Sequence, residues 1–244
     1  MKKSILLLHG WDYELYTKQT KDKNPWDYCQ KLTNQLNENF DVHTLKFPGF
    51  CGEKEQKKAW DVEDFAAYVN DYITKNNLKI DIILGYSFGG AVAVMYKSLY
   101  KSKAKLFLVA PAIIRNFDNS KTFVKTPKII QGLRNVLRNL YVSYVVKTPE
   151  MRFGTRFLKN TYQIIVRRDL RNELNSLDPD ELMLLYGTKD DAVDPETINK
   201  TLPDKIRQKI VMLEGADHDN IVTDYVEKLM ENLKKSLPKI KVRK

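Results

Sequence analysis

The chain has 244 residues, of which 43% are hydrophobic and 30% are charged. This length and apolar content are enough for one domain with a buried core, which excludes an intrinsically disordered protein. Two cysteines exclude a disulfide-rich scaffold, and Cys29 and Cys51 lack the spacing of a zinc site. We therefore expect a single domain with two reduced thiols, no metal and no cofactor.

The formal net charge of +10 at pH 7 is concentrated in one segment. Residues 111–178 hold 13 Lys and Arg against 5 Asp and Glu, whereas the rest of the chain holds 28 against 26. No recognised nucleic-acid-binding module accompanies this segment, so no nucleic-acid partner is predicted. A solvated basic face explains the charge, and the alternatives are attraction of anionic substrates and transient contact with an anionic membrane surface.

The apolar run near the N-terminus, Ile5–Leu8, has only four residues. The apolar core of a signal peptide takes at least about seven residues, and a membrane-spanning helix takes about 20. The sequence therefore predicts a cytoplasmic protein.

Strands and helices alternate over the first 110 residues. Short apolar runs and one alternating segment predict strands at 4–8, 40–47, 80–84 and 105–110. Apolar residues three and four positions apart predict helices at 26–39 and 62–73, and small residues begin another after Gly90. Asp61, with Asp64 three positions later, is typical of a helix start. This order predicts a doubly wound sheet.

The alternation stops at Pro111 and resumes near residue 181. Residues 111–178 have irregular helical patterning, which predicts an insertion over one end of the sheet. Beyond it, strands are predicted at 181–186 and 209–213, and helices at 195–202 and 221–237. Such sheets bind ligands beyond the carboxyl ends of their strands, so functional residues are expected in the strand-to-helix loops.

Residues 85–89 read Gly-Tyr-Ser-Phe-Gly and fit the pattern G-x-S-x-G between a buried strand and a helix. This is the context of a nucleophile elbow, a sharp turn that presents a serine hydroxyl to the cleft. Ser87 is therefore the candidate nucleophile. The alternative is a serine that only caps a helix in a glycine-rich turn.

A serine needs a base to take its proton, and the chain has three histidines. His218 follows the predicted strand 209–213 and is the candidate base. His43 lies inside a predicted strand, and His9 is better placed to hold its loop by hydrogen bonds. The backbone N–H groups of Trp11 and Phe88 are candidates to stabilise an oxyanion.

Three aspartates follow the predicted strand 181–186 and compete to orient the base: Asp190, Asp191 and Asp194. Only one of the three is needed for catalysis. The other two are expected to cap the loop or the helix that follows it.

Five segments together resemble the α/β-hydrolase superfamily, in its bacterial carboxylesterase and C–C hydrolase branch. These segments are HGW (9–11), FPGF (47–50), GYSFGG (85–90), GTKDDAV (187–193) and GADH (215–218). The resemblance spans nearly the whole chain and implies a triad of Ser87, Asp190 and His218, with Asp191 as the fallback acid. Cys51 departs from the family's usual glycine, and Tyr86 from its common histidine.

The resemblance implies an α/β-hydrolase fold, with a mostly parallel sheet of about six strands and helices on both faces. The core would comprise residues 1–110 and 179–244, and residues 111–178 would form a helical lid inserted after the family's sixth-strand equivalent. In this lid, an apolar stripe forms the core of the lid or, as the alternative, lines an acyl pocket together with nearby bulky side chains. They are Ile129, Leu133, Val136, Leu137, Leu140, Tyr141, Tyr144, Met151, Phe153 and Phe157.

The implied activity is that of a serine hydrolase that cleaves carboxylic esters of small molecules through an acyl-enzyme. A thioesterase or a C–C bond hydrolase with the same triad is the alternative within catalysis. A non-catalytic ligand-binding protein and a membrane-peripheral protein on the same fold are the alternatives outside it.

Overall fold

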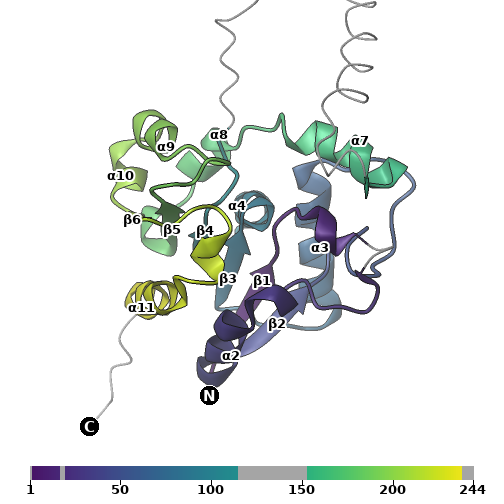
Figure 1. Cartoon of the computed structure of the whole chain (residues 1–244), viewed down its shortest axis with the longest axis horizontal. Helices are drawn as coiled ribbons and strands as arrows, with labels where there is room; N and C mark the ends of the chain where they lie inside the picture. The colour runs from purple at the N-terminus through teal and green to yellow at the C-terminus, as the bar shows by residue number, and fades with distance from the viewer. Residues whose placement is uncertain (1, 17–19, 115–152, 238–244) are drawn as a thin grey trace, which may run out of the picture.

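The computed structural model describes residues 2–16, 20–114 and 153–237 (Figure 1). Six strands form one sheet in the order β2-β1-β3-β4-β5-β6, and every neighbouring pair is parallel. The strands are β1 (Lys3–Leu8), β2 (Phe40–Leu45), β3 (Ile82–Tyr86), β4 (Lys105–Val109), β5 (Leu182–Gly187) and β6 (Ile210–Leu213). The expected α/β-hydrolase fold with about six mostly parallel strands is confirmed.

Helices cover both faces of the sheet. They are α2 (Gln30–Asn39), α3 (Val62–Lys75), α4 (Phe88–Tyr100), α7 (Arg156–Ile165), α8 (Arg171–Asn175), α9 (Pro195–Thr201), α10 (Asp204–Arg207) and α11 (Val226–Ser236). Apolar side chains of α3 and α4 form one core with alternate strand residues, and those of α2 and α11 form a second core on the opposite face. Burial on both faces explains why the central strands read as continuous apolar runs.

Local sequence signals set the ends of the helices. Asp61 caps α3 in a capping box, in which the Asp61 backbone N–H donates to the Asp64 carboxylate at 2.9 Å. The helix predicted at 26–39 begins as a 3₁₀ turn (Asp27–Cys29) that leads into α2.

The single helix predicted at 221–237 is confirmed only over Val226–Ser236. A 3₁₀ turn (Asn220–Val222) and α11 replace it, and the chain leaves helical geometry at Tyr225, with φ −99° and ψ 22°. Asn220 is bound to the preceding loop, because its backbone N–H donates to the Asp217 carboxylate at 2.7 Å. The first turn therefore belongs to that loop rather than to the helix.

Of the segment predicted as a lid, the structure describes residues 111–114 and 153–178. The predicted apolar stripe at 129–140 lies outside the described residues, as do Tyr141, Tyr144 and Met151. The described part contains α7 and α8, and α7 lies above the N-terminal end of α3 in the view of Figure 1. None of the helices in the described part of the chain has the length and apolar content needed to span a membrane.

Candidate active site

Ser87 lies in the sharp turn between β3 and α4. Its backbone has φ 50° and ψ −115°, a conformation that residues other than glycine rarely adopt and that stores strain. The turn fits because Gly89 passes close to β1. A Cβ on Gly89 would lie 2.1 Å from the Leu8 carbonyl oxygen. The sharp strand-to-helix turn expected from G-x-S-x-G is therefore present.

The three residues of the predicted triad form one chain of hydrogen bonds. The Nε2 atom of His218 lies 3.0 Å from the Ser87 hydroxyl oxygen. The Nδ1 atom of the same ring lies 2.9 Å and 3.1 Å from the two carboxylate oxygens of Asp190. The Asp190 side chain is fully buried and the His218 side chain is 15% exposed. The three side chains come from the ends of three different strands of the sheet.

Asp190 is the aspartate of its loop that meets the base. Its Oδ1 atom accepts hydrogen bonds from the backbone N–H groups of Ala192 and Val193, at 3.0 Å and 2.8 Å. Asp194 instead caps α9, where it accepts from the Thr197 hydroxyl at 2.6 Å, and this bond lowers the pKa of its carboxyl group. Asp191 is exposed to solvent. The structure thus brings Asp190, and not the fallback Asp191, to His218.

Hydrogen bonds fix the loop that carries His218. The Gly215 backbone N–H donates to the Thr188 hydroxyl at 2.9 Å, which ties this loop to the one that carries Asp190. On the other side of the histidine, the Asp217 backbone N–H donates to the Asn220 side chain at 2.9 Å. The imidazole is therefore anchored before and after its own position in the chain.

The two residues that carry the predicted oxyanion donors touch through their side chains. The ring centroids of Trp11 and Phe88 are 5.4 Å apart in an edge-to-face arrangement, so the β1 loop meets the start of α4. Within the described residues, neither backbone N–H donates a hydrogen bond to the protein. Both N–H groups therefore remain candidate oxyanion donors.

His9 is fully buried and connects two loops. Its Nε2 atom accepts from the Phe47 backbone N–H at 3.1 Å, so the proton is on Nδ1, which donates to the Gly10 carbonyl at 2.8 Å. Burial lowers the pKa of His9 to about 4, and the hydrogen bond to Gly10 opposes that effect only in part. His9 thus has the structural position expected of it.

The other singled-out side chains lie apart from the triad. His43 is on the edge strand β2, 3.5 Å from the Asp41 carboxylate. Cys29 and Cys51 are buried free thiols. Among the described residues, no cluster of three or more His, Cys, Asp or Glu side chains is arranged to hold a metal ion.

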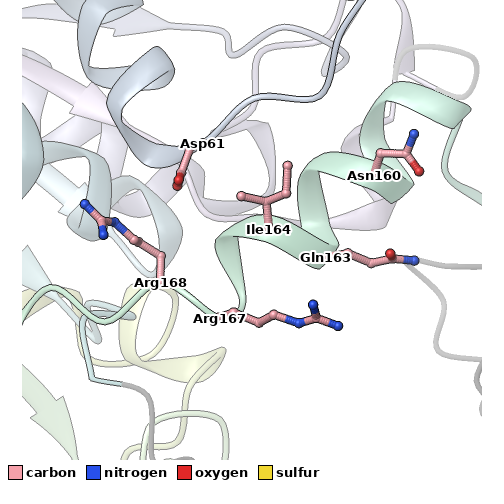
Figure 2. Close-up of a pocket in the computed structure, with 6 residues that line it drawn as sticks. All are labelled: Asp61, Asn160, Gln163, Ile164, Arg167 and Arg168. Atoms are coloured by element: carbon pink, nitrogen blue, oxygen red, sulfur yellow. The ribbon is translucent and has the colours of Figure 1, made fainter. Parts of the chain in front are cut away.

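A cavity of about 460 Å³ lies along α7, and no triad residue lines it. Its lining residues are Asp61, Asn160, Gln163, Ile164, Arg167 and Arg168. In Figure 2, Gln163 and Arg167 point away from Asp61, at the start of α3. Arg168 forms ion pairs with Glu63 and Glu173, which connects the chain after α7 to α3 and α8. The triad and this cavity are separate features.

Sequence reasoning missed contacts between residues that lie far apart in the chain. The Tyr86 hydroxyl donates to the His218 backbone carbonyl at 3.0 Å across 132 residues of chain, and the Arg168–Glu63 pair spans 105 residues. The sequence singled out Tyr86 only as a departure from a common histidine. No periodicity or motif relates residues so far apart.

Comparison with known proteins shows to which family the chain belongs. A model of the alpha/beta hydrolase family matches residues 5–231. A Mycoplasma genitalium protein named as an esterase/lipase is 28% identical, and the match covers 79% of each chain.

Solved structures share the fold at low sequence identity. The esterase EaEST from Exiguobacterium antarcticum has a TM-score of 0.64 and 17% identity, with 96% of this chain and 91% of that chain covered. A monoacylglycerol lipase from Paleococcus ferrophilus has a TM-score of 0.59 and 18% identity, with 96% and 95% covered. A bromoperoxidase from Bacillus anthracis has a TM-score of 0.65 and 15% identity, with 96% and 92% covered. Because the family model also spans nearly the whole sequence, this chain belongs to the alpha/beta hydrolase family.

Proposed function

We propose that the protein is a serine hydrolase that cleaves carboxylic esters of small molecules. The observation that carries this proposal is the unbroken chain of hydrogen bonds from the Ser87 hydroxyl through His218 to the buried Asp190 carboxylate. In this arrangement a neutral imidazole can accept the serine proton, and the carboxylate stabilises the imidazolium that forms.

Acylation begins when the Ser87 oxygen attacks the ester carbonyl carbon and its proton passes to Nε2 of His218. The backbone N–H groups of Trp11 and Phe88 stabilise the negative charge that develops on the carbonyl oxygen. The carbon–oxygen bond to the alcohol then breaks, and His218 gives its proton to the leaving alkoxide. A water molecule, deprotonated by the same histidine, then attacks the acyl carbon. The bond from this carbon to the Ser87 oxygen breaks, this oxygen takes the proton back from His218, and the carboxylic acid is released.

The surroundings of Trp11 favour an apolar acyl group. Its indole packs against the rings of Phe50, Phe65 and Phe88, and against Tyr162 on α7 at a centroid distance of 5.7 Å. An apolar lining with a few fixed polar groups is typical of sites that bind small organic molecules. The name of the Mycoplasma genitalium relative also supports an ester substrate. The lid at residues 111–178 stays a prediction, because residues 115–152 lie outside the described residues.

The test is hydrolysis of p-nitrophenyl esters of graded acyl length by the wild type, by Ser87→Ala and by Ser236→Ala. Removal of the Ser87 hydroxyl is expected to lower kcat by roughly 10³- to 10⁶-fold. Ser236 is a matched control, because its hydroxyl only caps α11 by donating to the Leu233 carbonyl at 2.7 Å. Its variant is expected to keep the wild-type rate.

Two results would contradict the proposal. Wild-type activity in Ser87→Ala would remove the triad from the reaction. A wild type that is inactive on every ester would exclude the esterase, and thioesters and C–C substrates assayed beside the esters would show whether the same triad serves another bond. Inactivity on all three classes would favour a non-catalytic binding protein.

A further inference from the structure

Tyr86 is the last residue of β3 and immediately precedes the candidate nucleophile. Strand alternation directs its side chain, with those of Ile82 and Leu84, into the core formed with α2 and α11. Tyr86 is only 7% exposed. Its hydroxyl reaches the loop after β6, although β4 and β5 lie between β3 and β6 in the sheet.

Within the described residues, two hydrogen bonds connect the elbow to the loop that carries the base. The Ser87 hydroxyl meets His218 Nε2 at 3.0 Å, and the Tyr86 hydroxyl donates to the His218 backbone carbonyl at 3.0 Å. The first bond contains the reacting groups, so it changes when the serine proton is transferred. The second bond contains no group that gains or loses a proton in the reaction.

The ring of Tyr86 is itself held firmly. It packs against the indole of Trp26 at a centroid distance of 6.4 Å and against the His218 imidazole at 5.5 Å. On the β1 side, a Cβ on Gly10 would lie 3.1 Å from two of its ring carbons, so the glycine lets the loop lie close against the ring. Burial raises the pKa of the Tyr86 hydroxyl well above its usual range, so it stays protonated and donates.

We propose that Tyr86 is a positioning residue, which holds the backbone of His218 at the distance from Ser87 that proton transfer requires. Residues 86 and 87 are neighbours in the chain, so one short segment fixes the base at two points, its carbonyl and its Nε2 atom. This inference rests on the proposed hydrolase function. Small displacements of a catalytic group can cost large factors in rate, because proton transfer needs hydrogen-bonding distance.

Tyr86→Phe tests the inference because it removes the hydroxyl and keeps the ring. We expect kcat on the best p-nitrophenyl ester to fall about tenfold, with KM changed less than about twofold. The rate at which a fluorophosphonate probe modifies Ser87 should fall by a similar factor, because this reaction also needs the base. Tyr72→Phe is the matched control. Tyr72 lies on α3, and its hydroxyl also donates to a backbone carbonyl, that of Thr44, at 3.5 Å.

The melting temperature of each variant separates positioning from stability. Support for the inference is a lower kcat and slower labelling in Tyr86→Phe, with a melting temperature close to that of Tyr72→Phe. Wild-type kcat and labelling in Tyr86→Phe would overturn the inference and leave the hydrolase function standing. A fall in kcat matched by a lower melting temperature than the control's would also overturn it, because the role would then be structural. A wild type that neither hydrolyses esters nor reacts with the probe would overturn both proposals.

Discussion

The two halves of the proposed triad are positioned by different kinds of contact. On the nucleophile side, Ser87 lies between a buried strand and a buried helix, where backbone segments touch. The contact between Gly89 and the Leu8 carbonyl leaves no room for a side chain. That half of the site is defined by steric exclusion.

The acid and the base lie on loops that are held mainly by hydrogen bonds. Two backbone N–H groups fix the Asp190 carboxylate, and the Thr188 hydroxyl fixes the start of the His218 loop. One close approach, of Gly187 to the Ala216 carbonyl, adds a steric contact. Added volume should therefore damage the nucleophile side at Gly89 and the other side only at Gly187, whereas loss of a donor or an acceptor should damage the side of Asp190 and His218 most.

The largest effect is expected from Gly89→Ala. The new Cβ would overlap the Leu8 carbonyl oxygen, which belongs to the backbone of a central strand and cannot move without distorting the sheet. We expect a loss of at least about 3 kcal/mol in the free energy of unfolding, measured by urea denaturation, or failure to fold. Gly10→Ala is the control, because its Cβ would meet only side-chain atoms of Tyr86 and Ser87 within 3.3 Å. Equal losses in both variants would contradict the steric account.

Asp190→Asn tests the hydrogen-bonded side. Because Oδ1 accepts from the backbone, the new amide nitrogen should take the place of Oδ2 and donate to His218. The ring would then have its proton on Nε2 and could not accept one from Ser87, so kcat should fall about 10³- to 10⁴-fold. Asp191→Asn, at an exposed position, should keep activity within about twofold of the wild type. A similar loss in both variants would refute this assignment of the acid.

His9 makes the nucleophile side sensitive to acid. Its pKa of about 4 in the folded protein lies below the unfolded value of about 6.5, so folding favours the neutral ring. The resulting stability, about 3 kcal/mol, is present above pH 6.5 and is lost as the pH falls toward 4. The free energy of unfolding, measured with urea at pH 4 and at pH 7, should differ less between the two pH values in His9→Gln than in the wild type. Identical pH dependence in the two proteins would contradict this role.

The smallest effect is expected from Thr188→Val, which removes one acceptor and keeps the side-chain shape. The Gly215 N–H would lose its partner, which should cost about 1 kcal/mol in the free energy of unfolding. We expect kcat to fall less than about threefold, because the other loop hydrogen bonds remain. Thr33→Val is the control, since its hydroxyl donates to a carbonyl within its own helical segment. A larger loss in the control would show that this loop bond adds little.

The elements that could be predicted from sequence are those set by local rules. The elbow at Ser87 follows from glycine spacing between an apolar strand and a helix, and the start of α3 follows from the Asp61 capping box. Local rules do not decide among the three loop aspartates, because these carry the same side chain within five positions of the chain. The resemblance to a family selected Asp190, and the loop geometry agrees with that choice.

What could not be predicted depends on contacts between distant segments. The hydroxyl of Tyr86 finds the His218 carbonyl only because the loop after β6 returns over the ends of two strands. The break before α11 has a similar origin, because Asn220 bonds to Asp217 instead of continuing a helix. Apolar periodicity reports which face of a segment is buried, but it does not report the partners of polar groups.

The order of the strands has a consequence for folding kinetics. β4 pairs with β5 through residues as far apart in the chain as Leu106 and Leu182, so this pairing closes the long loop between them. Ser87 lies before that loop, and Asp190 and His218 lie after it. Parallel pairing between distant segments is intrinsically slow, because chain entropy is lost before contacts form. During refolding, catalytic competence should therefore appear with this late closure and not with the earlier collapse around β1 and β3.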